Sequence, residues 1–302
     1  MRILVTGASG FLGRHLVAHL TKRGDEVIAL GVEPAQFEAG VRFVAADVRD
    51  RAQVREAIAA VEPERIVHLA ALSHVGDSWK RMADYFEVNV LGTENVAAEK
   101  GNARLLFAST AEVYGQVPDD EQPIDERRAP APRSPYALTK AAAERLAVAA
   151  GATVVRLFNL VGPGQAPTFA LPSFAAQLAA IELGTAPAVL RVGNLAARRD
   201  FVPVADAVAG VSLLIDRGEP GAVANLASGK AITISEALEL LRAVSGVNVQ
   251  VEIDPERFRP VDVPLLAGSC RTLAGLGWRV GHTLEAALEE VWQEARRAAR
   301  SR

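Results

Sequence analysis

The chain has 302 residues, of which 50% are hydrophobic and 23% are charged. This balance is typical of a globular protein that is long enough for one large core or two domains. The formal net charge of -3 gives no reason to expect nucleic acid or an anionic membrane surface as a partner. The single cysteine, Cys270, excludes an internal disulfide and fits a reducing compartment, so we expect a cytoplasmic protein.

Short apolar runs alternate with helical stretches through the first half of the chain. The runs are RILVTG, EVIALG, VRFVAADV, RIVHLAA, RLLFAST and TVVRLFNLVG. Runs of this kind are typical of strands that are buried on both faces, and the stretches between them have the periodicity of amphipathic helices. The pattern predicts an α/β fold of the Rossmann type, a doubly wound parallel sheet with helices on both faces.

The texture of the sequence changes after Gly162, where GPGQAPTFALP is rich in turn residues. The segment RRDFVPVADAVAGVSLLI and the following AVANLAS predict a helix and a strand that return to the main sheet. We therefore expect a Rossmann domain over 1–161 and 196–227. A smaller, discontinuous substrate-binding domain is expected over 162–195 and 228–302, above the carboxyl edge of the sheet where open α/β folds bind ligands.

Three glycines form the pattern G-x-x-G-x-x-G directly after the first strand and at the start of a helix. Glycines allow a tight turn and a close backbone approach, and the helix N-terminus offers free N–H groups to a pyrophosphate. The turn therefore predicts a site for NAD(H) or NADP(H). The cofactor-binding residues expected here are Gly7, Gly10, Phe11, Leu12, Gly13 and Arg14.

The end of the second strand leaves the choice between the two dinucleotides open. An NAD site usually carries an acidic side chain there and an NADP site a basic one, whereas this chain has Leu30, Gly31, Val32 and Glu33. Glu33 is either a ligand of the ribose or an ordinary loop charge. Arg14 either meets a 2′-phosphate or is only a surface residue of its helix.

The third and fourth strands are expected to complete the cofactor cleft. Asp47 ends the third strand, where a carboxylate can accept from an adenine amino group, and Asp50 is the better candidate for capping the next helix. The fourth strand ends in Leu69, Ala70 and Ala71, whose small side chains let a cofactor pass close to the backbone.

The stretch RSPYALTK supplies the candidate catalytic groups. Ser134 and Pro135 predict the N-cap and first residue of a helix, on which Tyr136 and Lys140 stand one turn apart. An ammonium near a phenol favours the phenolate, so we expect the pKa of Tyr136 to be lowered from about 10 towards neutrality. At the end of the fifth strand, Thr110 would bind a substrate oxygen with which Tyr136 exchanges a proton during hydride transfer.

Taken together, the motifs TGASGFLG, HLAA, ASTAEVYG, YALTK, RLFNLVGPGQ and RRDFVPVADA resemble the extended short-chain dehydrogenases/reductases that act on nucleotide sugars. The resemblance covers most of the chain and implies an NAD(P)-dependent oxidoreductase. It implies that Thr110, Tyr136 and Lys140 are catalytic and that Asp47 and Val48 lie beside the adenine.

Within this family the sequence looks most like the reductases of GDP-4-keto-6-deoxy-mannose. The likeness is carried by SHVGDSW, FNLVGPGQ, VGNLAARRDF and RFRPVDVPLLAGS. It implies that Asn159 faces the sugar nucleotide, that Arg199 contacts its phosphates, and that Arg259 and Asp262 hold the guanine end. The implied substrate-binding residues are Ser73, Thr110, Ala111, Asn159, Arg199, Arg259 and Asp262.

Three other functions stay open at this point. GDP-mannose 4,6-dehydratases share several of these phrases, and Glu112 is a candidate for the base they need, but Ala111 offers no donor and the chain lacks their Arg/Ser-rich insertion. A nucleotide-sugar 4-epimerase would use the same Thr/Tyr/Lys set, and Gly31 argues mildly against it. A non-catalytic dinucleotide-sensing protein would not need an intact proton-transfer set. The reductase fits with the fewest demands.

The expected partners are a nucleotide sugar and a second copy of the chain. Helices expected around 83–100 and 136–150 are rich in alanine and leucine. In the family that the chain resembles, the corresponding pair often forms a four-helix dimer interface, so the resemblance implies a homodimer. No metal is expected, since neither His68 nor His74 has a cluster of ligands around it in the sequence. We expect no nucleic acid and no membrane partner.

Overall fold

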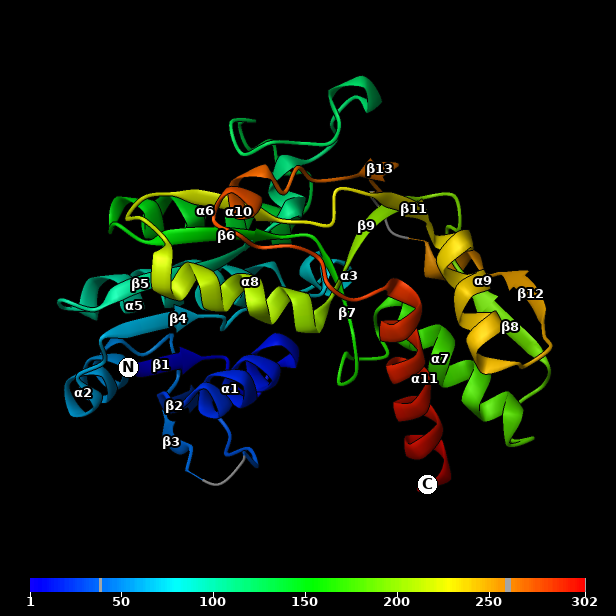
Figure 1. The fold of residues 1–302 in the computed structure, drawn as a ribbon, viewed down its shortest axis with the longest axis horizontal. Coiled ribbons are helices and arrows are strands. Elements are labelled where there is room, and N and C mark those ends of the chain that lie inside the picture. Colours follow the sequence, from blue (N-terminus) through cyan, green and yellow to red (C-terminus); the bar gives the residue numbers. More distant parts are fainter. Residues whose placement is uncertain (38–39, 259–261, 302) are drawn as a thin grey trace.

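The computed structural model describes residues 1–37, 40–258 and 262–301 of the chain. Its main sheet has seven parallel strands in the order β10-β6-β5-β4-β1-β2-β3, which confirms the expected Rossmann architecture (Figure 1). The strands are β1 (Arg2–Thr6), β2 (Glu26–Gly31), β3 (Arg42–Ala45), β4 (Arg65–His68), β5 (Arg104–Thr110), β6 (Thr153–Leu157) and β10 (Val223–Leu226).

Helices cover both faces of this sheet because each strand presents apolar side chains on both sides. In β1, Ile3 and Val5 belong to one buried cluster and Leu4 to another. The first cluster includes α1 (Phe11–Arg23) and α8 (Val204–Arg217). The second includes α2 (Arg51–Val61), α5 (Gly92–Glu99) and α6 (Pro135–Ala149). Two-sided burial explains the uninterrupted apolar runs in the sequence.

The single helix expected over 83–100 is interrupted. The chain forms α3 (Val75–Ser78), α4 (Met82–Tyr85) and a π-helical turn, η1 (Phe86–Leu91), before α5. Asn89 lies fully buried in the π turn, and its side chain bonds both the N–H and the C=O of Leu72. Such wide turns often occur at functional sites. Apolar periodicity in the sequence does not reveal this inserted geometry.

The remaining elements build a second, smaller lobe, which lies on the right of Figure 1. It has a four-stranded sheet, in which β9 pairs with β7, β11 and β13, and a separate pair, β12-β8. Its core lies between α7, α9 and α11. The strands are β7 (Asn159–Val161), β8 (Val189–Val192), β9 (Arg198–Pro203), β11 (Ala231–Thr233), β12 (Gln250–Ile253) and β13 (Leu265–Leu266). Its helices are α7 (Ala170–Glu182), α9 (Ile234–Ser245) and α11 (Leu284–Arg300), with a 3₁₀ turn, η4 (Pro255–Arg257), after β12. Helix α10 (Arg271–Gly275) packs instead on the main lobe, where Leu273 joins the first cluster. Two further 3₁₀ turns, η2 (Ala111–Tyr114) and η3 (Asp119–Glu121), follow β5.

The chain crosses between the two lobes more than once, and the domain boundaries expected from sequence stay a prediction. After β9, helix α8 and strand β10 return to the main sheet as predicted, with β10 parallel to β6. Strand β7 precedes the expected boundary at 161 and β9 follows the one at 196, yet the two pair with each other in the smaller sheet, with Asn159 opposite Phe201. Turn residues, on which the expected boundaries rest, carry no information about strand pairing.

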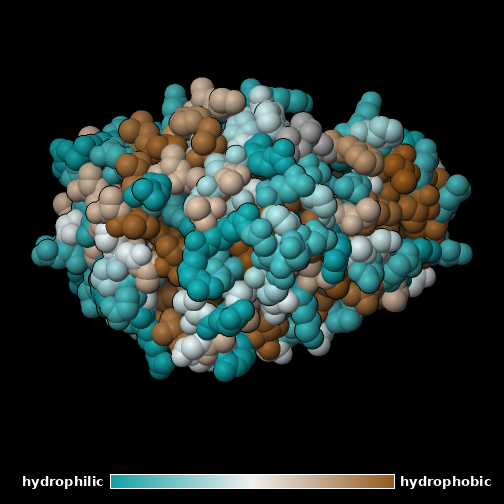
Figure 2. Space-filling model, turned by 90° about the horizontal axis from the view of Figure 1, so that it is seen from above, coloured by the Kyte–Doolittle hydropathy of each residue, from teal (hydrophilic) through white to brown (hydrophobic). Residues whose placement is uncertain are grey.

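The surface carries no sign of a membrane span among the described residues, since none of their helices is both long and apolar enough to cross a bilayer. Figure 2 shows apolar side chains in separate patches between hydrophilic ones on the face seen from above. Such scattered apolar surface is normal for folded domains.

Asp200 in β9 joins three segments of the smaller lobe and its border. Its carboxylate is fully buried and accepts hydrogen bonds from the Ser228 N–H and hydroxyl at 2.7 and 2.6 Å. It also accepts from the N–H groups of Gly229, at 3.0 Å, and Gly268, at 3.2 Å. Burial raises the pKa of Asp200 even against these four donors.

We expect Asp200→Ala to lower the free energy of unfolding by about 3 kcal/mol, because it leaves three backbone donors, of which that of Gly268 is buried, without their shared acceptor. Urea unfolding measures this loss. The matched control is Asp216→Ala, which removes a half-exposed carboxylate paired with Arg23 at 2.9 Å and should change stability by less than about 1 kcal/mol. Equal effects of the two substitutions would contradict the assignment.

Candidate active site

The turn between β1 and α1 lies against the end of β4 without room for side chains. Gly7 has a φ of +66°, and a Cβ built on it would lie 2.6 Å from the backbone nitrogen of Ala70. A Cβ on Gly13 would lie 2.2 Å from the carbonyl oxygen of Gly7. Gly10 is the N-cap of α1 and has no side chain to occupy the first N–H groups of the helix. These groups stay available to an anion, which is the feature a dinucleotide pyrophosphate needs.

A cavity of about 540 Å³ opens beside this turn, at the carboxyl edge of the sheet. Most of the residues expected to hold a dinucleotide line it. These are Gly7, Gly10, Asp47, Val48, Leu69, Ala70 and Ala71. Ser9 and the segment 30–33, with Glu33, also line the cavity. The other residues expected to bind the dinucleotide are not part of its wall. Phe11, Leu12, Gly13 and Arg14 belong to the first turns of α1, and Tyr136 and Lys140, which were also expected to contact the cofactor, belong to α6.

Several charged groups of this cavity are paired within the protein. The Asp47 carboxylate accepts from the Arg49 guanidinium at 2.6 Å and from the Arg49 N–H at 2.9 Å, which lowers its pKa. Arg81, on the same wall, pairs with Asp84 at 2.7 Å. The Arg14 guanidinium donates to the carbonyl of Ser9 at 2.9 Å. The expected bond from Asp47 to an adenine would therefore share an oxygen already used by Arg49.

Tyr136 lies at the start of α6 as the sequence predicts. Ser134 caps this helix by accepting from the Ala137 N–H at 3.1 Å, and Pro135 is its first residue. The Tyr136 side chain is 9% exposed, and its hydroxyl is hydrogen-bonded to the side chain of Thr110 at the end of β5. The chain thus brings the three expected groups, Thr110, Tyr136 and Lys140, to one end of the sheet.

The prediction that the pKa of Tyr136 is lowered is wrong for the protein without its dinucleotide. Burial raises the pKa of Tyr136 above its usual value, and the hydrogen bond from Thr110 only partly offsets the rise. Lys140 is itself fully buried, and burial lowers its pKa to about 7. A lysine that holds its proton only weakly at neutral pH is a poor source of the positive charge that the sequence argument required.

The surroundings of Lys140 explain this low pKa. Its Nζ lies 4.2 Å from the centre of the Phe107 ring, and the nearby Glu144 favours the ammonium. The Glu144 carboxylate, however, is already bonded to Arg156 at 2.6 Å and to the Ser109 hydroxyl at 2.6 Å. Since Glu144 is largely neutralised by Arg156, it compensates the buried lysine only in part.

Glu112 and Ala111 follow Thr110 in the turn η2. The Glu112 N–H donates to the Thr110 hydroxyl at 3.2 Å, and the Glu112 carboxylate raises the pKa of Tyr136 through its negative charge. Glu112 therefore lies close enough to the phenol for its charge to act on it. Ala111 is buried and offers only a methyl group.

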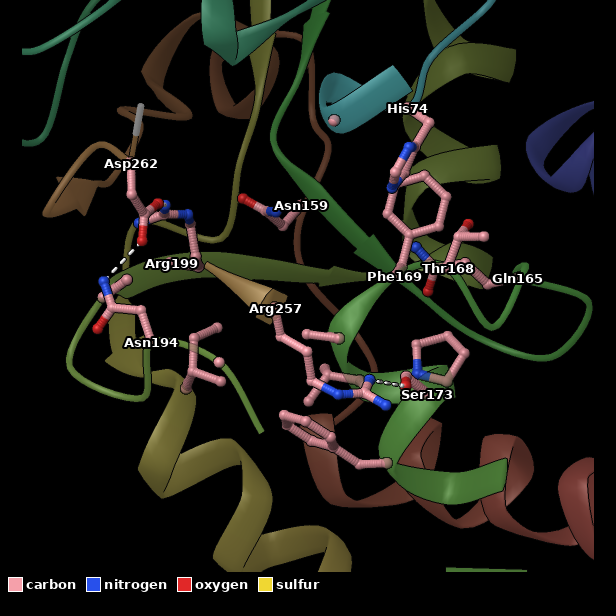
Figure 3. A pocket seen from close by; sticks show the side chains of 18 of the residues that line it. His74, Asn159, Gln165, Thr168, Phe169, Ser173, Asn194, Arg199, Arg257 and Asp262 are labelled. Atoms are coloured by element: carbon pink, nitrogen blue, oxygen red, sulfur yellow. Dashed lines mark hydrogen bonds and ion pairs between the residues drawn. The ribbon is translucent and has the colours of Figure 1, made fainter. Parts of the chain in front are cut away.

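A second cavity, of about 350 Å³, lies in the smaller lobe (Figure 3). Asn159, Arg199 and Asp262 line it as the resemblance implies. Arg199 donates to Asp262 at 2.6 Å and to the carbonyl of Val263 at 2.7 Å, while Asn194 donates to the other oxygen of Asp262 at 2.6 Å. These bonds fix the Asp262 carboxylate at the edge of the cavity.

The sequence reasoning missed other residues of this second cavity. His74 and Phe169 line one side with their rings edge to face, 5.9 Å between centres, and Arg257 reaches towards Ser173 on the other (Figure 3). The motif SHVGDSW contains His74 and could have indicated it. The expected substrate-binding residue in this motif was the neighbouring Ser73, which does not line the cavity. The expected Arg259 lies outside the described residues.

Tyr136 lines neither cavity but belongs to a small buried cluster that connects their walls. The cluster holds Val75 and Tyr85, and Leu72 packs against it. Leu72 lines the cavity beside the glycine turn, and Val75 follows His74 of the second cavity. The chemistry available at this point is proton exchange with a group that reaches from one cavity towards the other. Among the described residues, no group of three or more His, Cys, Asp or Glu side chains is placed to hold a metal ion.

Comparison with known proteins agrees with this geometry. Residues 4–291 match the model of the family described as GDP-mannose 4,6 dehydratase. The chain is 33% identical over 301 residues to the GDP-6-deoxy-D-mannose reductase of Pseudomonas aeruginosa, covering 96% of this chain and 95% of that protein.

Solved structures give the same result. RMD from Pseudomonas aeruginosa, complexed with NADPH, superposes with a TM-score of 0.87 at 30% identity, covering 99% of this chain and all of that one. UDP-glucose 4-epimerase from Thermus thermophilus, in complex with NAD, also gives a TM-score of 0.87, at 31% identity over 98% of this chain and 99% of that one. The chain belongs to the GDP-mannose 4,6-dehydratase family of extended short-chain dehydrogenases/reductases and is an NAD(P)-dependent enzyme that modifies nucleotide sugars.

Proposed function

We propose that this enzyme reduces the 4-keto group of a GDP-linked 4-keto-6-deoxy sugar, giving a product of the GDP-rhamnose type. One observation carries the proposal: the buried phenol of Tyr136 belongs to a cluster in which Leu72 lines the cavity beside the glycine turn and Val75 adjoins the cavity of the smaller lobe. Reduction of a ketone needs a hydride on carbon and a proton on oxygen, and nothing further.

The raised pKa of Tyr136 suits a proton donor. A phenol that holds its proton at neutral pH can pass it to the alkoxide that develops as a carbonyl is reduced. The Thr110 hydroxyl, which is hydrogen-bonded to Tyr136 in this structure, would turn its single hydrogen to the substrate oxygen when the sugar binds. Lys140 can then return the proton to Tyr136, since its pKa of about 7 lets it both release and regain a proton near neutrality.

A dinucleotide in the cavity beside the glycine turn, NADPH or NADH, would supply the hydride. Gly7 and Gly10, with the N-terminus of α1, would hold its pyrophosphate, and the segment 69–71 would line its path towards Tyr136. The residues around the second strand support neither dinucleotide over the other, because the acidic Glu33 and the paired Arg49 line the same wall.

The residues around Asp262 in the second cavity support binding of the nucleotide part of the substrate there. The fixed Asp262 carboxylate can accept from two N–H groups of a guanine edge, and the Arg257 guanidinium on the same wall can bind an anion. Asn159 lines the same cavity, where it can contact the sugar (Figure 3).

A second candidate, the 4,6-dehydratase reaction, is favoured by one observation, a carboxylate, Glu112, near enough to Tyr136 to raise its pKa. That reaction needs a base to remove a proton and an acid to release water, besides a returning hydride. Buried Ala111 supplies no donor for this purpose. The reductase therefore stays the first candidate.

We expect the purified enzyme to oxidise NADPH or NADH when GDP-4-keto-6-deoxy-mannose is added, followed by absorbance and product analysis. The control Tyr136→Phe should lose about 100-fold or more in turnover while keeping its dinucleotide affinity. Conversion of GDP-mannose without added reductant would assign the dehydratase. Interconversion of C4 epimers of an intact nucleotide sugar would assign the epimerase, and dinucleotide binding without any turnover would assign a sensor.

The low pKa of Lys140 predicts a pH dependence of stability in the protein without its dinucleotide. Between pH 7 and 10.5 the unfolded chain binds a proton on this lysine that the native state does not, so stability rises with pH in that window. Below pH 7 both states bind the proton, so the native state bears the full free-energy cost of burying the charged ammonium.

The free energy of unfolding of wild type minus that of Lys140→Met should therefore rise by about 1 kcal/mol per pH unit from pH 7.5 to 9.5. Urea unfolding at a series of pH values gives this difference. The exposed Lys230 provides the matched control, Lys230→Met, whose difference should stay level. If the difference in unfolding free energy for Lys140→Met also stayed level with pH, the lowered pKa of Lys140 would be refuted.

We also propose a homodimer through α6 and the helix formed by α4, η1 and α5, as the resemblance implies. Leu138 and Leu146 on α6 and Leu91 on η1 are 47%, 38% and 45% exposed, and the two elements pack side by side. Such apolar side chains on adjacent helices support a self-complementary surface.

Sedimentation at micromolar concentration should give a dimer for the wild type and a monomer for Leu138→Glu combined with Leu146→Glu. The control Ile253→Glu alters a more exposed apolar side chain on β12, in the other lobe, and should leave the dimer intact. A wild type that sediments only as a monomer would rule out this interface.

A further inference from the structure

His68, the last residue of β4, is fully buried and takes no part in the chemistry described above. Both ring nitrogens are hydrogen-bonded: Nδ1 to the Thr6 hydroxyl at 2.6 Å and Nε2 to the Thr93 hydroxyl at 3.0 Å. Burial and the nearby Lys140 lower its pKa to about 3, so the ring is neutral and carries one proton.

The surrounding bonds determine which nitrogen carries that proton. The Thr93 hydroxyl donates its only hydrogen to the carbonyl of Asn89 at 2.6 Å, so it must accept from His68 Nε2–H. Nδ1 is then the acceptor and receives the Thr6 hydroxyl hydrogen. The Thr6 oxygen accepts in turn from the N–H of Ala70 at 3.2 Å. All four hydrogen bonds of this series point the same way, from the N–H of Ala70 to the carbonyl of Asn89.

The two ends of this chain of bonds reach the two parts of the active site. Ala70 is the wall of the dinucleotide cavity against which Gly7 packs. At the other end, the Asn89 side chain donates to the Thr139 hydroxyl at 3.0 Å, and Thr139 donates to the carbonyl of Tyr136 at 2.8 Å. The neutral His68 ring, with one donor and one acceptor, therefore connects the wall of the dinucleotide cavity to the helix that carries Tyr136.

We propose that His68 is a positioning residue that couples the wall of the dinucleotide cavity, through Thr6 and Ala70, to the catalytic helix, through Thr93 and Asn89. The proposal rests on the proposed function for the role of Tyr136. It assigns separate tasks to the two nitrogens. Nδ1 keeps the wall of the dinucleotide cavity in place, and Nε2 keeps the π turn and therefore Tyr136 in place.

Two substitutions separate these tasks, because the amide of Asn can take the place of Nδ1 and that of Gln the place of Nε2. His68→Asn should keep dinucleotide affinity within about 2-fold and lower kcat about 10-fold or more, since a small misplacement of Tyr136 is costly. His68→Gln should keep kcat near that of wild type and weaken dinucleotide affinity about 5-fold, the loss of one hydrogen bond. Thr93→Val and Thr6→Val should reproduce the Asn and Gln results respectively.

Affinity is measured by titration calorimetry with NADPH and with NADH, kcat with the sugar that the wild type reduces, and folding by thermal melting. The control Thr153→Val removes another buried threonine hydroxyl, bonded to the carbonyl of Glu219 at 2.9 Å, and should alter stability alone. Variants of His68 that lose stability but neither kcat nor affinity, or that lose both together, would overturn the proposal. Dinucleotide affinity is measured without any sugar, so this part of the test still decides the role of Nδ1 if the protein does not reduce the proposed sugar.

Discussion

The contact between the turn after β1 and the end of β4 is the constraint on which the rest of the structure depends. Gly7 comes so close to the backbone of Ala70 that even a methyl group would collide with it. This approach places the N-terminus of α1 and the end of β4 on either side of one cavity. Because parallel strands end at the same edge, Thr110 of β5 and the start of α6 follow at the next positions along that edge.

The chemistry of the site follows from burial more than from the pairing of tyrosine and lysine. Tyr136, Lys140 and His68 are all removed from water, and burial disfavours the charged form of each. The result is a protonated phenol, a lysine poised near neutrality and a neutral imidazole. The neighbouring Glu144 and Arg156 form an ion pair of their own and leave these groups only partly compensated. A site of this kind favours proton donation at a carbonyl over the stabilisation of a standing phenolate.

The relatives of this chain perform different reactions on a shared framework, and the structure indicates where differences can arise. The glycine turn and helix α6 lie against the main sheet. The second cavity is built by segments that lie far apart in the sequence, such as those of Asn159, Asn194 and Asp262. Such segments outside the main sheet can change without disturbing it, so substrate choice can diverge while the groups at the carboxyl edge of the main sheet persist.

The sequence by itself determined the strand and helix order, the glycine turn, the cap at Ser134 and the helix spacing of Tyr136 and Lys140, because each depends on neighbours within a few residues. Tertiary structure alone decided the pKa of Tyr136, the π turn at Asn89 and the pairing of β7 with β9. It also brought His74 and Arg257 to the second cavity. These features depend on burial and on contacts between distant segments, and a linear pattern of residue types records neither the loss of water around a side chain nor the partner it meets.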